Sequence, residues 1–118
     1  MTYELMVEGT FDAAHQLRGY DGPCEKLHGH TWKVRLYIKG SKLNELGMVS
    51  DFKEIKLLLQ FAIAKLDHTN LNVFPYFKKV NPTSENVAKY IFDQVSKKAD
   101  VAKVTVFESA TTSASYTR

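Results

Sequence analysis

Apolar and polar residues alternate along two segments near the start of the chain. In residues 3–11, the apolar positions that share one face are Tyr3, Leu5 and Val7. In residues 31–39 the alternation is unbroken, with apolar side chains at Trp32, Val34, Leu36 and Ile38. Because side chains along a strand point to opposite faces in turn, this pattern predicts two β-strands, each with one buried face.

Two later segments follow the period of a helix. Asp51 is a suitable N-cap for a helix that runs to residue 66. One stripe of that helix is apolar, at Ile55, Leu58, Leu59, Ala62 and Leu66. The dipeptide Asn81-Pro82 then interrupts the chain, and Thr83 is placed to cap a second helix. The apolar stripe of this second helix consists of Val87, Ile91 and Val95.

The last part of the chain returns to strand patterns, at residues 102–108 and 113–117. The element order is then ββααββ, which predicts an α+β fold with a four-stranded antiparallel sheet and two helices on one face. Because the sequence contains neither a repeat nor a linker, we expect residues 1–118 to form a single domain. Four strands leave two open edges that can pair with other chains, so we also expect a closed homo-oligomer.

Composition narrows the class of protein. The 118 residues are 44% hydrophobic and 25% charged, enough to bury a core without a metal or a disulfide. The formal net charge of +3 comes from scattered residues, which argues against a nucleic-acid partner. A single cysteine excludes an internal disulfide, and no apolar run is long enough to cross a bilayer. We therefore expect a soluble, cytoplasmic protein with no membrane partner.

Histidines supply the first candidate chemistry. His28 and His30 are two residues apart at the entry to a predicted strand, so their side chains project to the same side. If the first two strands pair antiparallel, His15 lies beside them. Three imidazoles suit Zn²⁺ and leave a fourth position for water or substrate, as in catalytic zinc sites. The alternative is a chance His-Gly-His loop and a half-buried His15 with ordinary hydrogen bonds.

Other reactive side chains each have two interpretations. Cys24, four residues before His28, is either a base or nucleophile activated by a metal, or a small buried residue. Asp67 and His68 follow the first predicted helix, either as a functional pair or as a turn cap. Glu108 is in phase with apolar positions of its strand, so it either reaches solvent or faces a ligand.

In their order and spacing, these motifs resemble the 6-pyruvoyl-tetrahydropterin synthase family across nearly the whole chain. The matching segments are FDAAH at 11–15, CEKLHGH at 24–30, MVSDF at 48–52, LDHTNLN at 66–72, NPTSEN at 81–86, and Glu108. Three residues separate Cys24 from His28, a spacing similar to that of the bacterial branch that serves queuosine synthesis. Residues 110–118 match the family pattern least well.

The resemblance implies a T-fold, a ββααββ subunit that trimerises into a barrel, commonly as two stacked trimers, with active sites at subunit interfaces. It implies Zn²⁺ bound by His15, His28 and His30. The implied substrate is 7,8-dihydroneopterin triphosphate, and the implied products are 6-carboxytetrahydropterin, acetaldehyde and triphosphate. Which basic residues bind the triphosphate stays open.

The resemblance also implies roles for the other motif residues. Cys24 would be the general base on one side of the substrate's side chain. His68, oriented by Asp67, would be the proton relay on the other side. Glu108 would bind the amino-pyrimidine end of the pterin and take part in the relay. Two further residues are either pterin contacts or part of a helix N-cap, namely Thr83 and Ser84.

Three alternative functions stay open. The same site could form 6-pyruvoyl-tetrahydropterin, or it could cleave the side chain to 6-hydroxymethyl-dihydropterin. In the family branch with the second activity, a glutamate three residues before the His-Gly-His motif replaces the cysteine. Glu25 holds that position here, directly after Cys24, so it is either a second base in a dual enzyme or an exposed surface residue. The third alternative, a non-catalytic subunit that binds zinc or a purine-like ligand, would not need Cys24 or Asp67–His68.

Overall fold

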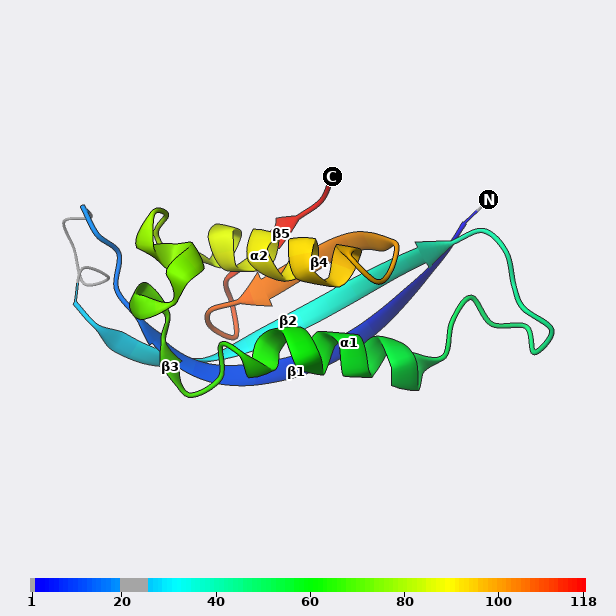
Figure 1. Cartoon of the computed structure of the whole chain (residues 1–118), viewed down its shortest axis with the longest axis horizontal. Helices are drawn as coiled ribbons and strands as arrows, with labels where there is room; N and C mark the ends of the chain where they lie inside the picture. The colour runs from blue at the N-terminus through cyan, green and yellow to red at the C-terminus, as the bar shows by residue number, and fades with distance from the viewer. Residues whose placement is uncertain (1, 20–25) are drawn as a thin grey trace.

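Two long helices and five strands form the part of the chain that the computed structural model describes, residues 2–19 and 26–118 (Figure 1). The elements are β1 (Tyr3–His15), β2 (His28–Gly40), α1 (Phe52–Ala64), β3 (Thr69–Asn70), η2 (Leu71–Val73), η3 (Pro75–Lys78), α2 (Ser84–Ser96), β4 (Val101–Phe107) and β5 (Ser113–Tyr116). Here η2 and η3 are short 3₁₀ helices. Within the described ranges, no helix is long and apolar enough to cross a membrane.

The strands β1 and β2 pair antiparallel over their whole length, from Tyr3 opposite Gly40 to His15 opposite His28. Both strands are longer than their apolar alternation predicted. Pairing depends on backbone hydrogen bonds, so it continues beyond the point where the side-chain alternation ends. This extension places His15 and His28 inside the ladder, directly opposite each other.

The sheet has the order β3-β1-β2-β4-β5, and four of its strands form the expected antiparallel core. The expectation of a purely antiparallel four-stranded sheet was wrong, because β3 adds a fifth strand that runs parallel to β1. This strand pairs Thr69 and Asn70 with Ala13 and Ala14. A two-residue strand is too short to show any alternation in the sequence. The α+β class and the two helices are confirmed.

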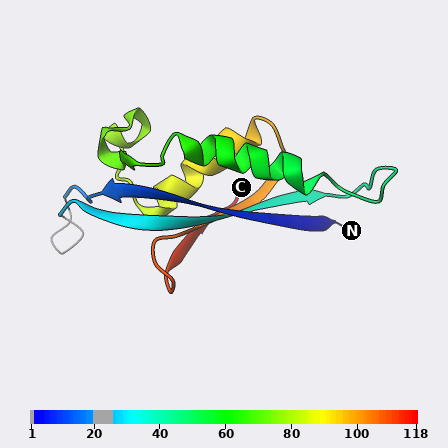
Figure 2. The ribbon, with the colours of Figure 1, turned by 90° about the horizontal axis from the view of Figure 1, so that it is seen from below.

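Both helices pack on one face of the sheet (Figures 1 and 2). Asp51 caps α1, where its Oδ1 accepts a hydrogen bond from the backbone N of Lys53 at 2.8 Å. A methyl group on Gly9 would lie 3.1 Å from Cδ1 of Ile63, so this glycine lets α1 approach β1 closely. The fully buried side chains of the resulting core include Trp32, Val34, Leu36, Leu59, Val87 and Ile91.

The opposite face of the sheet is polar, and part of the outer surface of α1 is apolar. On the polar face, Arg35 Nε donates to Glu8 Oε1 at 2.9 Å between the two strands of the ribbon. On α1, three large apolar side chains are more than half exposed: Phe52, Leu57 and Phe61. Along the outer edge of β1, β3 pairs only with Ala13 and Ala14. In the single chain, the apolar surface of α1 and the open edge of β1 are therefore both uncovered, and they lie beside each other.

Candidate metal centre and relay

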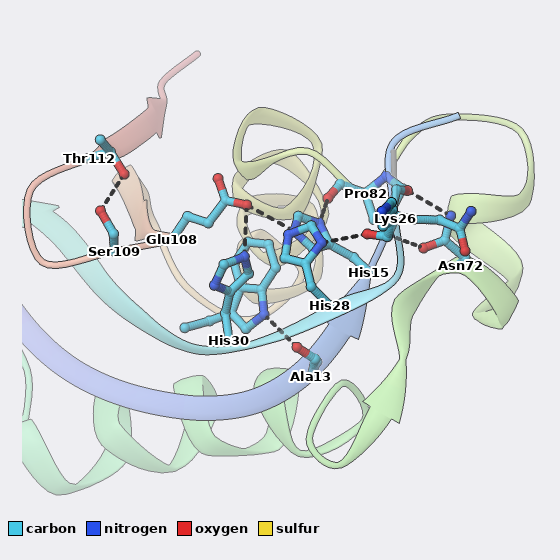
Figure 3. Close-up of polar contacts among 12 residues, drawn as sticks. Ala13, His15, Lys26, His28, His30, Asn72, Pro82, Glu108, Ser109 and Thr112 are labelled. Carbon is cyan, nitrogen blue, oxygen red and sulfur yellow. Dashed lines mark hydrogen bonds and ion pairs between the residues drawn. The ribbon is translucent and has the colours of Figure 1, made fainter. Parts of the chain in front are cut away.

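The structure brings His15, His28 and His30 together at one end of the β1–β2 ribbon (Figure 3). His15 and His28 are direct cross-strand partners, and His30 lies two residues further along β2. Their ring centroids are 4.7 Å (His15–His28), 5.2 Å (His15–His30) and 4.6 Å (His28–His30) apart. Trp32 continues the same face of β2, and its ring packs edge-on against His15. The convergence expected from the sequence is present.

Backbone carbonyls determine which ring nitrogens can bind a metal. Nδ1 of His15 lies 2.7 Å from the carbonyl oxygen of Pro82, and Nδ1 of His28 lies 2.6 Å from that of Lys26. A carbonyl oxygen only accepts, so Nδ1 carries a proton in both rings, and in the neutral imidazole Nε2 then keeps its lone pair. This is the outer-shell arrangement that orients histidine ligands in metal sites.

Glu108 completes the cluster from the end of β4. Its Oε1 lies 2.8 Å from Nε2 of His15 and 3.3 Å from Nε2 of His30. Among the described residues, neither of these buried Nε2 atoms has a hydrogen-bond partner of acceptable geometry. In neutral His15, a lone pair thus faces a carboxylate oxygen. That contact requires a positive charge between the two atoms.

A metal ion fits this donor set. One ligand atom from each of His15, His28, His30 and Glu108 lies within 4.8 Å of all the others. Burial is the main cause that lowers the pKa of His30, and the neighbouring imidazoles lower it further against the opposing effect of Glu108. His30 therefore stays neutral and able to bind a metal at neutral pH. The cluster satisfies the requirements of a metal site, with imidazoles that suit zinc.

Asp67 and His68 lie at the edge of β1 and bind the backbone of Asp12. The backbone N–H of Asp12 donates to Asp67 Oδ1 at 2.9 Å, and the backbone N–H of His68 donates to the carbonyl of Asp12 at 2.6 Å. Nδ1 of His68 lies 3.1 Å from Asp67 Oδ2. The Asp12 hydrogen bond is the main cause that lowers the pKa of the Asp67 carboxyl. At neutral pH an ionised Asp67 therefore orients the imidazole.

The backbone of His68 is in the left-handed region, with φ of 57°. A non-glycine residue rarely takes this conformation, which costs about 1–3 kcal/mol and is found most often at functional sites. The two backbone hydrogen bonds to Asp12 hold it in place. The imidazole itself is 79% exposed.

Asp12 was not predicted as a site residue from the sequence. Its carboxylate accepts a hydrogen bond from the hydroxyl of Thr31, its cross-strand partner, and lies within 4.8 Å of the reactive atoms of Asp67 and His68. Side chains alternate along a strand, so Asp12 points to the opposite face of the ribbon from His15. The Asp67–His68 pair beside Asp12, the candidate relay group, and the histidine cluster, the candidate metal cluster, therefore face different sides of the ribbon. The signal that could have revealed the opposite faces is that His15 follows Asp12 by three positions, an odd number along a strand.

Two asparagines form hydrogen bonds with the backbone of the segment after His15. No site role was predicted for either of them. Asn72 accepts from the backbone N–H of Gln16 at 2.8 Å and donates to its carbonyl at 2.9 Å. Asn81 makes the same pair of contacts with Arg18, at 3.0 and 2.9 Å. In each case an amide side chain pairs with a backbone as another strand would. These contacts stabilise the chain just after the first histidine.

Comparison with known proteins identifies the family. Residues 4–118 match the family model described as 6-pyruvoyl tetrahydropterin synthase. The chain belongs to this family. The solved structure of Caenorhabditis elegans 6-pyruvoyl tetrahydropterin synthase superposes with a TM-score of 0.91 at 26% identity, and the match covers 100% of this chain and 96% of that one. The T-fold subunit is therefore confirmed, and its assembly into a barrel stays a prediction.

Two similar members of the 6-pyruvoyl tetrahydropterin synthase family have different names. A Synechocystis protein named 6-carboxy-5,6,7,8-tetrahydropterin synthase is 36% identical over 116 residues, which cover 92% of this chain and 88% of that protein. A Pyrococcus furiosus protein named dihydroneopterin monophosphate aldolase is 33% identical over 97 residues, which cover 82% of this chain and 78% of that protein. Membership in the family therefore leaves more than one pterin reaction to consider.

Four predicted site residues remain: two lie at the start of α2, and two lie outside the described residues. Thr83 acts as the N-cap of α2, with its hydroxyl accepting from the backbone N of Asn86 at 3.1 Å, and Ser84 is the first residue of that helix. This supports the capping interpretation, and a pterin contact stays a prediction. The two candidate bases lie outside the described residues, namely Cys24 and Glu25.

Proposed function

We propose that this chain is a zinc-dependent 6-carboxytetrahydropterin synthase, a carbon–carbon lyase that acts on 7,8-dihydroneopterin triphosphate. The observation that carries the proposal is the cluster of three imidazoles with Glu108, in which the buried Nε2 atoms of His15 and His30 face the carboxylate. Three histidines are a ligand set typical of catalytic zinc. Similarity to the Synechocystis protein over most of both chains supports the choice of this reaction.

The described residues provide groups for proton movement. Zinc, when bound, supplies a Lewis acid beside the hydroxyl groups of the substrate's side chain. His68 relays protons, because its imidazole is exposed and Asp67 fixes its orientation. Cys24 is assigned the role of general base from the sequence alone. Two groups on opposite sides of the substrate's side chain can then move protons between its carbons.

Glu108 is assigned to the pterin ring. A carboxylate accepts paired hydrogen bonds from the amino group and adjacent N–H of an amino-pyrimidine. The Glu108 side chain is 29% exposed, so a planar ring can reach it from solvent. Glu108 lies between β4 and β5, beside the histidines, so we propose that the pterin binds at this end of the sheet (Figure 3).

The proposed active site includes two subunits. Within one chain, the relay group and the metal cluster face opposite sides of the ribbon, and His68 is exposed. A neighbouring copy can instead bring its own Asp67–His68 to the metal. The open edge of β1 and the exposed apolar residues of α1 support a threefold assembly that covers both, as a trimer or a hexamer.

Product analysis tests the proposed reaction directly. The zinc-loaded protein is incubated with 7,8-dihydroneopterin triphosphate, and the pterins formed are identified by mass spectrometry. We expect 6-carboxytetrahydropterin together with acetaldehyde. A 6-pyruvoyl product without acetaldehyde would assign triphosphate elimination instead, and no turnover would favour a non-catalytic subunit.

A second candidate activity is cleavage of the side chain to 6-hydroxymethyl-dihydropterin. It is favoured by the similarity to the Pyrococcus protein named as an aldolase, and by the presence of Glu25 beside Cys24. A carboxylate base could remove a proton from a different hydroxyl of the same substrate. If both activities exist, Cys24→Ala should lose the carboxy product and keep the hydroxymethyl product, and Glu25→Ala should do the reverse. Absence of 6-hydroxymethyl-dihydropterin from wild type and Cys24→Ala would exclude this activity.

A further inference from the structure

Glu108 lies closer to the histidines than the role of a pterin anchor requires. In the described part of the chain, its ion-pair contacts are to His15 and His30, both through Oε1. The neighbouring turn contains its own hydrogen bonds, from Ser109 Oγ to Thr112 Oγ1 at 2.6 Å and from the backbone N of Thr111 to Ser109 Oγ at 3.3 Å (Figure 3). The turn is therefore held without the help of the carboxylate.

The contacts of Glu108 Oε1 with the two histidines are as short as, or shorter than, the spacing of ligands around one metal ion. Zinc bonds of about 2.0–2.1 Å in a tetrahedral site place neighbouring ligand atoms about 3.3 Å apart. Oε1 of Glu108 lies 3.3 Å from Nε2 of His30 and 2.8 Å from Nε2 of His15. Neither Nε2 makes a hydrogen bond of good geometry to any described residue. With His28, these residues bring four ligand atoms within 4.8 Å of one another.

We propose that Glu108 is the fourth ligand of the resting metal centre, and that a bound pterin removes it from the metal. This proposal rests on the proposed function, because the pterin is the ligand that competes for the carboxylate. When the carboxylate binds the amino-pyrimidine, its oxygens point toward the N–H groups of the pterin and no longer toward the metal. The fourth position of the metal is then free for the side chain of the substrate.

This exchange links recognition of the ring to activation of the side chain. A carboxylate ligand reduces the positive charge of the centre, and its departure restores that charge when the substrate is in place. Glu108 has three rotatable bonds between its backbone and its carboxylate, and it follows the last residue of β4, Phe107, so its side chain can swing without a change in the sheet. The metal would then be fully electrophilic only with a pterin bound.

Metal affinity tests the ligand role without any measurement of activity. Zn²⁺ is titrated into the apo protein against a chromophoric chelator. We expect Glu108→Gln to raise the Kd at least about tenfold. Glu108→Asp, which shortens the side chain by one methylene, should also raise the Kd, so the test does not depend on the folding of one variant.

Glu45→Gln is the matched control, because this exposed glutamate lies in the connection at the other end of β2. Equal Kd values for wild type and both Glu108 variants would overturn the proposal.

A second measurement tests the exchange. Co²⁺ replaces zinc, and its visible absorption reports the ligand set. The probe is unsubstituted pterin, which has no side chain to reach the metal, with its binding followed by fluorescence. Saturating pterin should shift the wild-type spectrum and leave that of Glu108→Gln unchanged. Pterin that fails to bind the wild type, or that binds it without a shift, would overturn the exchange. Failure to form 6-carboxytetrahydropterin would refute the proposed reaction and leave these metal measurements standing.

Discussion

The metal cluster and the relay group depend on the same strand, β1, but they are built in opposite ways. His15 is 1% exposed, and its ring nitrogen is held by the carbonyl of Pro82 from a distant segment. His68 is 79% exposed and is held through its backbone. The cluster is buried or half-buried in its own chain, whereas the imidazole of the relay group is exposed.

This difference supports the proposal that the site is divided between subunits. Metal ligands need fixed geometry, which buried side chains with paired ring nitrogens provide before any ion binds. A proton relay needs access to the substrate, which an exposed imidazole on a rigid strand edge provides. On this proposal, one chain supplies the metal ligands, and its Asp67–His68 pair acts in the site of a neighbouring copy.

Removal of a buried histidine should have the largest effect. In His15→Ala the metal loses a ligand and the Pro82 carbonyl loses its partner. We expect loss of bound zinc and of measurable turnover, because His15 is one of the three imidazole ligands proposed for the site. Elemental analysis of the purified variant measures the zinc, and His68→Ala, which removes no proposed ligand, is the matched control. Active, metal-free protein would contradict the zinc site itself.

The fold should survive the loss of the metal. The core of Trp32, Leu36, Leu59 and Ile91 is buried without any metal ligand in it. After chelation, circular dichroism should therefore report intact secondary structure while activity is lost, unlike a zinc finger. Unfolding on chelation would show that the ion has a structural role.

Loss of the relay should have the next largest effect and leave the metal in place. We expect His68→Ala to lower turnover by about 10²-fold or more, the scale typical of an acid–base group, with unchanged zinc content. Cys24→Ala should behave in the same way. Loss of zinc from Cys24→Ala would mean that the thiol is a ligand.

A mixture of two inactive variants tests whether the metal cluster and the relay group of one active site come from different chains. His28→Ala lacks a metal ligand and His68→Ala lacks the relay. If each site combines two chains, a refolded 1:1 mixture contains some sites with both halves intact. Random assembly in a symmetric oligomer restores about one quarter of wild-type activity. No restored activity in mixed oligomers confirmed by mass spectrometry would place both halves in one chain.

A smaller effect is expected from Asp67→Asn, and it should depend on pH. The hydrogen bond from the Asp12 N–H, the main cause, lowers the pKa of Asp67 in the folded chain. A lowered folded pKa adds stability above the unfolded pKa, and this stability is lost as pH falls through the folded value. Asp67→Asn should therefore be less stable than wild type at pH 7 and equally stable at about pH 2, measured by thermal unfolding. An equal difference at both pH values would contradict the role of the charge.

Much of this site could be predicted from the sequence, because its residues lie on regular elements. The spacing of His28 and His30 on a strand fixes their common face, and antiparallel pairing brings His15 beside them. The caps Asp51 and Thr83 were predicted for the same reason, since capping is local. A single sequence can reveal interactions between residues that are close in the chain or related by the period of a strand or helix.

The rest depends on contacts between distant segments. The carbonyl of Pro82 that orients His15 lies 67 residues away, and the backbone of Asp12 that holds Asp67 lies 55 residues away. Backbone groups have the same chemistry at every position, so no residue pattern marks them. The two-residue strand β3 was missed because it is too short to have a period, yet it places the relay beside β1.

The smallest expected effect separates a helix cap from a pterin contact at Thr83. The Thr83 hydroxyl accepts from the backbone N of Asn86, so Thr83→Ala should lower stability by about 1 kcal/mol, with a fall in Tm of a few degrees. Thr83→Ser keeps the hydroxyl and should restore most of this loss. KM for the pterin should stay near the wild-type value in both variants, because the hydroxyl is already engaged in the cap. Ser84→Ala is the matched control and should change Tm less, since Ser84 is inside the helix. A raised KM in Thr83→Ala that Thr83→Ser corrects, without a change in Tm, would instead assign this hydroxyl to the substrate.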